Sequence, residues 1–204
     1  MKILFVGQKN NHDGYLNDYM SDLLLHGLRG VYGNNVIDHP GSIHLYKNQA
    51  KNFDKSRLWG KGITTSNILD NYNLIDRTEI LTKIKKKFFD VIIYGSVRRN
   101  DDLLDEASKF NNKIILIDGE DDNYIETKYL TLGLYFKREL KFHHDKVYPI
   151  SFAIPKNKII EGSLFNPKFL LSPLIPGRLK TYIYEDELSY YNMYQNSIFS
   201  LTYK

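Results

Sequence analysis

The first thirty residues alternate between a short apolar run and an amphipathic segment. Ile3–Val6 is continuously apolar and is closed by Gly7, a pattern typical of a strand buried on both faces of a parallel sheet. After a polar loop, apolar residues recur at spacings of three and four, as on one face of a helix. These residues are Leu16, Met20, Leu23, Leu24 and Leu28. Gly30 and Gly33 mark the helix exit, so the chain is predicted to open as strand, loop and helix.

The next fifty residues carry a weaker pattern. Residues 36–37 predict a second short strand that ends at Pro40. Residues 42–65, which include Trp59, are polar with scattered aromatic side chains and predict a large insertion or loop. Residues 76–89 predict a helix with four apolar side chains on one side. These four are Ile80, Leu81, Ile84 and Phe88.

The clearest unit lies in the middle of the chain. Residues 90–96 and 113–119 each show the pattern of a buried strand that ends in a polar loop, and residues 101–110 between them predict a helix. A connection of this length is too long for a hairpin and fits a right-handed crossover. The pattern therefore predicts two parallel neighbouring strands.

The last third of the chain continues the α/β pattern. Residues 135–140 and 147–154 predict further short strands, and Pro149 limits pairing within the second. Prolines mark residues 161–177 as a linker. A strand, a helix and a strand are then predicted at residues 181–184, 186–196 and 198–202.

These elements together predict an α/β fold with a Rossmann-like parallel sheet flanked by helices. Residues 1–160 form the main domain in this prediction, and residues 161–177 form the linker. Residues 178–204 are predicted to begin a second α/β unit at the C-terminus, which the chain leaves incomplete.

Composition and charge are those of a globular protein with a mild basic bias. Apolar residues make up 42% and charged residues 25%, which excludes global disorder. The 28 Lys and Arg exceed the 24 Asp and Glu by too little to predict nucleic-acid binding. The densest basic run is interpreted as a solvated helix end rather than a binding patch, because cations favour the carbonyl end of the helix dipole. It comprises Lys83, Lys85, Lys86 and Lys87.

The chain contains no cysteine, which excludes disulfides and cysteine-based metal sites or nucleophiles. A reducing cytoplasm is the simplest location. The opening apolar run is too short for a signal peptide, and no stretch approaches the roughly 18 apolar residues of a membrane span. We therefore expect a cytoplasmic protein with no transmembrane segment, while peripheral membrane attachment stays open.

Candidate chemistry gathers at the carboxyl ends of the predicted strands, where ligands bind in open parallel sheets. Three loops meet there, at residues 7–14, 95–99 and 118–122. The first begins with Gly7 and could present His12 to a ligand, but it lacks the spacing of a dinucleotide or P-loop motif. A polar connection in which Asp13 caps the following helix is an equal alternative.

Charged residues dominate the other two loops. Arg98 and Arg99 could pair with phosphate or carboxylate groups of a ligand, or they could neutralise the acidic loop beside them. The acidic loop could bind a hard cation or supply a base, because crowded carboxylates raise one another's pKa. Helix capping and other structural use is the alternative. The four carboxylates are Asp118, Glu120, Asp121 and Asp122.

Two later groups bear on the same edge. Residues 137–139 are charged and are predicted to form an ion-pair network with the acidic loop. Residues 143–145 have the composition of a metal site, but neighbouring strand residues point to opposite faces, so His143 and His144 are interpreted as surface residues. No metal site is assigned.

Four ordered segments resemble a known family. They are Tyr94-Gly95-Ser96-Val97-Arg98-Arg99, Ile117-Asp118-Gly119-Glu120-Asp121, Phe136-Lys137-Arg138-Glu139-Leu140 and Pro149-Ile150-Ser151-Phe152-Ala153-Ile154-Pro155. In this order they resemble the N-terminal half of a bacterial and viral group of glycosyltransferases that is similar to GT-B enzymes of the spore-maturation CgeB type. Residues 190–204 resemble the beginning of that group's second Rossmann-like domain.

The resemblance implies an acceptor-side domain that takes part in sugar transfer from a nucleotide-sugar donor to an acceptor. Activity requires a complete C-terminal domain, and no cofactor is implied beyond the nucleotide-sugar itself. GT-B chemistry generally needs no metal, because basic side chains and helix N-termini stabilise the leaving diphosphate. We assign His12 and Asp13 as the acceptor base and its orienting partner. The predicted cleft lining is Gly7, Ser96, Arg98, Asp118, Glu120 and Asp121.

Two other classes of function are open. A non-catalytic module could bind a nucleotide or carbohydrate at the same edge, or dock a protein through its tyrosine-rich C-terminal segment. A metal-dependent hydrolase centred on the acidic loop is the third option, and it requires ligands from elsewhere in the chain.

Overall fold

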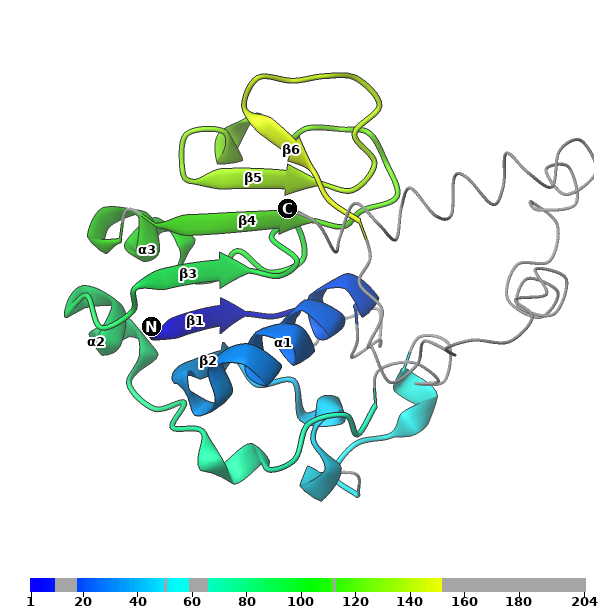
Figure 1. Cartoon of the computed structure of the whole chain (residues 1–204), viewed down its shortest axis with the longest axis vertical. Coiled ribbons are helices and arrows are strands. Elements are labelled where there is room, and N and C mark those ends of the chain that lie inside the picture. The colour runs from blue at the N-terminus through cyan, green and yellow to red at the C-terminus, as the bar shows by residue number, and fades with distance from the viewer. Residues whose placement is uncertain (10–17, 50, 59–65, 112, 152–204) are drawn as a thin grey trace, which may run out of the picture. The chain divides into compact units, whose positions relative to one another are not determined.

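Six strands form one parallel sheet in the computed structural model (Figure 1). The structure describes residues 1–9, 18–49, 51–58, 66–111 and 113–151. In the order of the sheet, the strands are β2 (Val36–His39), β1 (Ile3–Val6), β3 (Val91–Tyr94), β4 (Ile114–Asp118), β5 (Leu134–Lys137) and β6 (Val147–Pro149). All neighbouring pairs are parallel. The prediction of an α/β fold with a Rossmann-like parallel sheet is therefore confirmed.

Helices cover both faces of the sheet. α1 (Tyr19–Tyr32) packs on one face, where Met20 and Leu25 are buried. α2 (Ile80–Lys85) and α3 (Leu104–Phe110) contact each other on the opposite face. From β1 the chain crosses through α1 to β2, and it then returns past β1 through α2 to β3. The strand order thus reverses between β1 and β3, which makes this pair the topological switch point.

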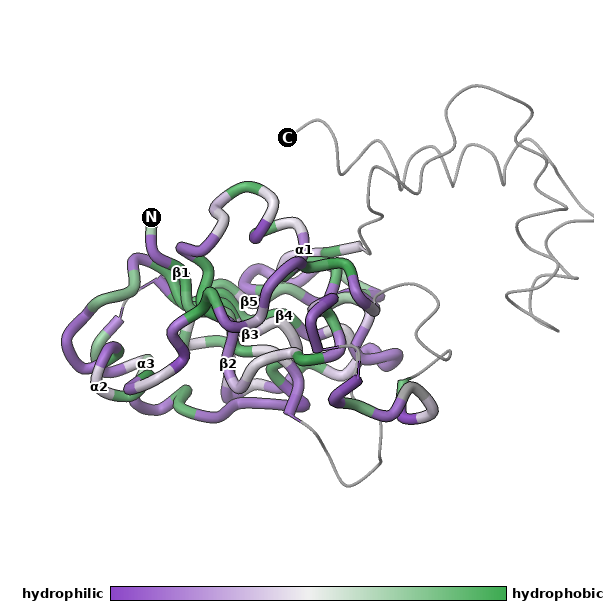
Figure 2. The backbone as a smooth tube through the Cα atoms, turned by 90° about the horizontal axis from the view of Figure 1, so that it is seen from below, coloured by the Kyte–Doolittle hydropathy of each residue, from purple (hydrophilic) through white to green (hydrophobic). Residues whose placement is uncertain are grey.

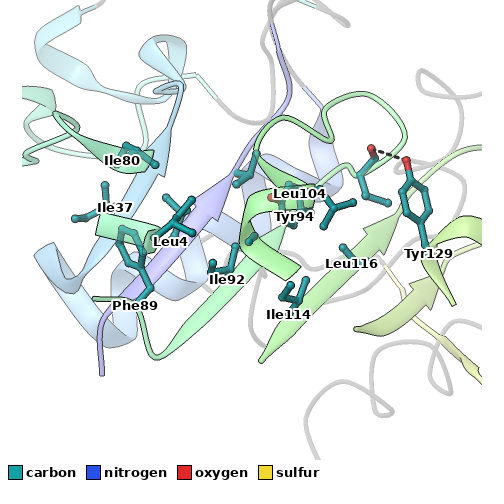
Figure 3. Packing of buried hydrophobic residues seen from close by; sticks show 14 of the residues in the cluster. Leu4, Ile37, Ile80, Phe89, Ile92, Tyr94, Leu104, Ile114, Leu116 and Tyr129 are labelled. Atoms are coloured by element: carbon teal, nitrogen blue, oxygen red, sulfur yellow. Dashed lines mark hydrogen bonds between the residues drawn. The ribbon is translucent and has the colours of Figure 1, made fainter. Parts of the chain in front are cut away.

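Alternating side chains of the strands fill one core on each face. Leu4 and Val6 of β1 belong to the cluster that α2 and α3 cover, together with Leu116 of β4 (Figure 3). Ile3 and Phe5 belong to the cluster beneath α1. Figure 2 shows apolar strand segments gathered at the centre with hydrophilic loops around them. Burying one such side chain contributes about 1.5–3 kcal/mol to folding stability, so the clusters on the two faces together stabilise the sheet.

Side-chain and glycine caps define the ends of α1. The Asp18 carboxylate accepts hydrogen bonds from the backbone N–H groups of Met20 and Ser21, at 3.0 and 3.1 Å. Gly33 ends the helix with a φ of +56°, which confirms the exit that the sequence predicts. The cap is therefore Asp18 and not Asp13, which lies outside the described residues.

The second helix is shorter than the sequence predicts. A helix is expected over residues 76–89, whereas α2 spans Ile80–Lys85. Lys87 adopts a left-handed φ of +54°, which ends the helix and turns the chain. Phe88 is consequently 43% exposed, and Phe89 enters the core in its place. Of the four apolar side chains predicted on one side of this helix, Ile80 and Ile84 are buried, whereas Leu81 and Phe88 are exposed.

Other boundaries differ by a few residues. α3 begins at Leu104 and not at residue 101, because the Asn100 side chain accepts the Asp102 N–H at 3.1 Å and holds a turn there. β5 ends at Lys137 and β6 at Pro149, so both strands stop earlier than expected.

The predicted loop at residues 42–65 carries short 3-10 turns and is anchored to the sheet. Asp38, at the carboxyl end of β2, accepts hydrogen bonds from the Tyr46 hydroxyl at 2.9 Å and from the Arg77 guanidinium at 2.6 Å. Arg77 also stacks on the Tyr72 ring, 3.7 Å from its centroid. A buried carboxylate with these partners ties the beginning of the insertion, and the segment that follows the insertion, to the end of β2.

Several predictions fall outside the part of the chain that the structure describes. They concern Trp59, residues 152–154, the linker at 161–177 and the second unit at 178–204. Among the described helices, none is long and apolar enough to cross a bilayer.

Gly95 is expected to be essential for packing α1 onto β3. A Cβ at this position would overlap the ring of Phe5 and the hydroxyl of Ser21, which are both buried. We expect Gly95→Ala to lower the free energy of unfolding by about 1–3 kcal/mol or more. Gly30→Ala, on an open side of α1, is the matched control and should raise it by about 0.5–1 kcal/mol. Urea denaturation measures both, and equal effects would contradict the packing argument.

Candidate functional site

The candidate site lies at the carboxyl ends of β1, β3, β4 and β5. The loops that follow β1 and β3 flank the topological switch point, where open α/β sheets bind ligands. Asn100 joins these two loops, because its buried side-chain amide donates to the Gly7 carbonyl at 2.6 Å. The Gly7 N–H in turn donates to the His39 carbonyl at 2.9 Å. The three strand ends are thus held together by hydrogen bonds.

The loop after β3 also holds the beginning of α1. Ser96 is buried, and its hydroxyl donates to the Asp18 carboxylate at 3.1 Å. Arg99 lies 3.4 Å from the same carboxylate. Asp18 therefore caps α1 and offsets the positive end of the helix dipole at the switch point.

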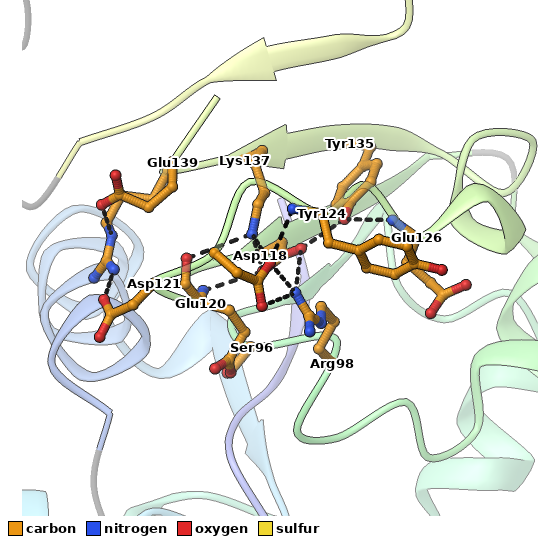
Figure 4. Close-up of polar contacts among 12 residues, drawn as sticks. Ser96, Arg98, Asp118, Glu120, Asp121, Tyr124, Glu126, Tyr135, Lys137 and Glu139 are labelled. Atoms are coloured by element: carbon orange, nitrogen blue, oxygen red, sulfur yellow. Dashed lines mark hydrogen bonds and ion pairs between the residues drawn. The ribbon is translucent and has the colours of Figure 1, made fainter. Parts of the chain in front are cut away.

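Asp118 is the centre of the acidic loop (Figure 4). Its side chain is fully buried and accepts hydrogen bonds from the Tyr135 hydroxyl at 2.6 Å and from Lys137 Nζ at 3.1 Å. Lys137 is fully buried as well, and it stands directly opposite Asp118 in the β4–β5 register. Burial, and secondly the hydrogen bond to Asp118, raises the pKa of Tyr135, so the phenol remains a donor.

Arg98 and Arg99 pair with the acidic loop. Arg98 Nη1 donates to both carboxylate oxygens of Asp122, at 2.7 and 2.9 Å. Arg99 forms a bidentate pair with Glu120, in which Nε donates at 2.5 Å and Nη2 at 3.2 Å. The hydrogen bond from Arg98 lowers the pKa of Asp122 to about 2, and the hydrogen bond from Arg99 lowers that of Glu120. The expectation that crowding raises these pKa values is wrong for Asp122 and Glu120, because each carboxylate has a guanidinium as its nearest partner.

Residues 137–139 complete the ion-pair network that the sequence predicts. Lys137 lies 3.3 Å from Asp122 in addition to its contact with Asp118. Arg138 pairs with Asp121 and with Glu139. Beside this network is an open hollow of about 440 Å³. Its lining comprises Asp121, Asp122, Asn123, Arg138, Glu139, Leu140 and Lys141.

A second polar group, which sequence reasoning missed, lies beside Gly7. His39 ends β2, and Lys9 pairs with Asp102 at 2.8 Å near it. Burial lowers the pKa of His39, and the charge of Asp102 partly opposes this effect. The sequence placed the strand end at Pro40 without assigning the histidine before it a role. Asn100 was also missed, although it directly follows the two arginines.

The predicted site residues fall into two sets. Ser96, Arg98, Asp118, Glu120 and Asp121 are brought together at the carboxyl edge, next to Gly7 at the end of β1. His12 and Asp13 lie outside the described residues. His143 is almost fully exposed and pairs with Asp145 at 3.3 Å. Within the described ranges, no group of three His, Cys, Asp or Glu side chains could hold a metal ion.

No family model, curated protein or solved structure matches the chain. The glycosyltransferase resemblance therefore stays a prediction. The geometry shows a carboxyl edge on which cations and carboxylates are paired one against another. The carboxylates of such an edge can accept hydrogen bonds from the hydroxyl groups of a ligand, and its guanidinium groups can donate hydrogen bonds.

Lys137 is expected to be essential for stability because it neutralises a buried carboxylate. We expect Lys137→Met to lower the free energy of unfolding by about 3–5 kcal/mol, since Asp118 would keep its charge without its ammonium partner. Lys128→Met removes the exposed partner of Asp101 and should change it by less than about 1 kcal/mol. Chemical denaturation followed by circular dichroism distinguishes the two. A small loss in Lys137→Met would mean that the pair contributes little.

The lowered pKa values predict acid sensitivity. A carboxylate with a lower pKa in the folded chain binds fewer protons than in the unfolded chain, so its stabilisation is present above about pH 4 and is lost as the pH falls towards 2. Arg98→Gln should reduce this slope, because Asp122 then titrates closer to its ordinary value. Denaturation between pH 2 and pH 5 measures the slope. Lys51→Gln, which removes an exposed charge, should leave the slope of stability with pH unaltered. An equal slope in both variants would contradict the conclusion that Arg98 lowers the pKa of Asp122.

Proposed function

We propose that this chain is the acceptor-side domain of a GT-B-type glycosyltransferase. In this proposal the carboxyl edge binds a hydroxyl-bearing acceptor, and a complete second domain supplies the nucleotide-sugar. The absence of cysteine fits a cytoplasmic location. Support comes from the parallel sheet with its switch point and from the resemblance of the four ordered segments.

The charge balance of the edge is the observation that carries the acceptor-side assignment. Lys9, Arg98, Arg99, Lys137 and Arg138 each lie within 4 Å of a carboxylate. A nucleotide diphosphate needs uncompensated cations or an open helix N-terminus, whereas the N-terminus of α1 is capped by the Asp18 carboxylate. A neutral, hydroxyl-rich ligand needs no excess charge. The carboxylate oxygens of the edge can accept hydrogen bonds from the hydroxyl groups of such a ligand, whereas they would repel a diphosphate.

Asp121 offers the sharpest test of acceptor binding, because its side chain is exposed at the hollow and can be changed without disturbing the core. We expect the chain to bind neutral oligosaccharides in saturation-transfer NMR, and Asp121→Asn to weaken binding about tenfold through the loss of a charged hydrogen bond. Asp70→Asn, also exposed but paired with Lys47 in the segment that follows β2, is the control. Binding of UDP, GDP or CDP in place of glycans would contradict an acceptor-side role.

A non-catalytic carbohydrate-binding module is the second candidate. The observation in its favour is that Asp118 and Glu120 are already engaged by strong donors, and a carboxylate so engaged is a poor base. Mass spectrometry of the bound glycan after incubation with nucleotide-sugars and the complete protein separates the two candidates. Glycan binding without transfer would favour the module.

A further inference from the structure

Lysines from three segments gather at the amino ends of the strands, opposite to the candidate site. Lys2 directly precedes β1, Lys113 directly precedes β4, and residues 85–87 lead from α2 towards β3. Parallel strands begin at one edge of a sheet, so these segments meet there, as the positions of the N-terminus and α2 in Figure 1 show. We call Lys2, Lys85, Lys86, Lys87, Phe88 and Lys113 the amino-end patch.

Contacts between the segments show that the patch is continuous. Lys2 Nζ lies 5.9 Å from the centroid of the Phe88 ring. The Asp90 N–H donates to the Lys2 carbonyl at 2.9 Å, and the Ile92 N–H donates to the Lys113 carbonyl at 3.0 Å. Lys2 and Lys113 therefore flank the first residues of β3.

The patch combines positive charge with exposed apolar surface. Its five lysines are exposed, and Asp90 offsets one of their charges. Phe88 is 43% exposed, and the adjacent Met1 is 53% exposed. A solvated helix end explains the lysines of α2 alone. It does not explain why Lys2 and Lys113 lie at the same edge, with Lys2 beside a partly exposed aromatic ring.

Two residues at the end of α2 differ from those usually preferred at a helix end. Lys87 and Phe88 occupy the two positions after the helix cap, since the Phe88 N–H donates to the Lys83 carbonyl at 3.0 Å and the Lys87 N–H to the Ile84 carbonyl at 2.9 Å. Glycine is favoured at the first of these positions, yet Lys87 adopts the left-handed φ there. The residue after it usually packs on the helix, whereas the Phe88 ring packs edge-on against Phe89, with 5.2 Å between the centroids, and stays 43% exposed. A helix end of this kind does not require a lysine at the first position or a partly exposed ring at the second.

We propose that the amino-end patch binds the surface of an anionic lipid bilayer. Lysines are attracted to the negative surface potential, and an aromatic ring enters the boundary between headgroups and acyl chains. Charge complementarity alone would also fit a nucleic acid. The partly exposed ring of Phe88, beside Lys2, favours a bilayer, which has an apolar phase beneath its charge.

Membrane binding through this end is independent of the proposed function, because the two surfaces lie at opposite ends of the strands. The carboxyl edge with Asp118 and Arg98 would face the aqueous phase. Failure of one proposal therefore leaves the other standing.

Flotation of the full chain with vesicles tests the proposal. We expect binding to vesicles of phosphatidylcholine with 30% phosphatidylserine, and not to vesicles of phosphatidylcholine alone. Binding should fall when the salt concentration rises from 50 to 300 mM, because the lysines act through a screened field. Absence of binding to the anionic vesicles at 50 mM salt, from a chain that circular dichroism shows to be folded, would overturn the proposal.

Matched variants separate the patch from net charge. Changing Lys85, Lys86 and Lys113 to Gln should weaken binding about a hundredfold, at roughly fivefold per lysine. The control removes the same charge from exposed lysines elsewhere, and should weaken binding less than fivefold. Its members are Lys47, Lys51 and Lys128. Equal losses in the two triple variants would overturn the assignment to the patch.

The aromatic residue provides a second comparison. Phe88→Ser should weaken vesicle binding about tenfold, as expected for the loss of a buried ring. Phe142→Ser, at a position that is 72% exposed in the β5–β6 connection, should leave binding unchanged. If the patch variants instead lose binding to a 20-nucleotide single strand, and the native chain ignores vesicles, the patch is a nucleic-acid surface and the lipid proposal is wrong.

Discussion

The buried carboxylate of Asp118 constrains the whole carboxyl edge of the sheet. An isolated buried charge is costly, so its neighbours must supply donors. Tyr135 and Lys137 supply them from β5, and the parallel register places Lys137 directly opposite. The ion pairs continue from this buried pair to the surface, because Lys137 also contacts Asp122, which pairs with Arg98. The loops after β3, β4 and β5 therefore form one network, in which cations and carboxylates are balanced against each other.

A second constraint fixes the position of α1 relative to this network. Gly95 lets the first turn of the helix approach β3 closely, since Phe5 and Ser21 fill the space that a Cβ would take. Asp18 can then cap the helix and accept the hydroxyl of Ser96 at the same time. A single carboxylate thus satisfies the backbone of one element and the loop of another. The same carboxylate occupies the N–H groups with which the helix N-terminus could bind an anion, which supports the proposal of a neutral ligand.

The sequence predicted the parallel sheet because continuous apolar runs such as Ile3–Val6 have few other stable environments. The sequence also predicted that Arg98 lies near the acidic loop that contains Asp122, because parallel strands end at the same edge of a sheet. Periodicity could not show where α2 ends, because a left-handed Lys87 is decided by the surrounding fold. The same limit applies to Asn100, whose partner Gly7 is ninety-three residues away. Contacts between distant loops have no local pattern, so sequence gives the residues of the edge but not their pairings.

The parallel sheet also separates two kinds of surface. The carboxyl ends of the six parallel strands and the loops that follow them lie at one edge, and the amino ends lie at the other. Charged side chains at one edge therefore do not neutralise those at the other. Four residues of strand span about 13 Å, which exceeds the Debye length at physiological salt. The basic amino end can therefore respond to an anionic surface without altering the paired network around Asp118. If the chain lies on a bilayer through Phe88, ligands reach the carboxyl edge from solution, which favours a water-soluble acceptor over one embedded in the same membrane.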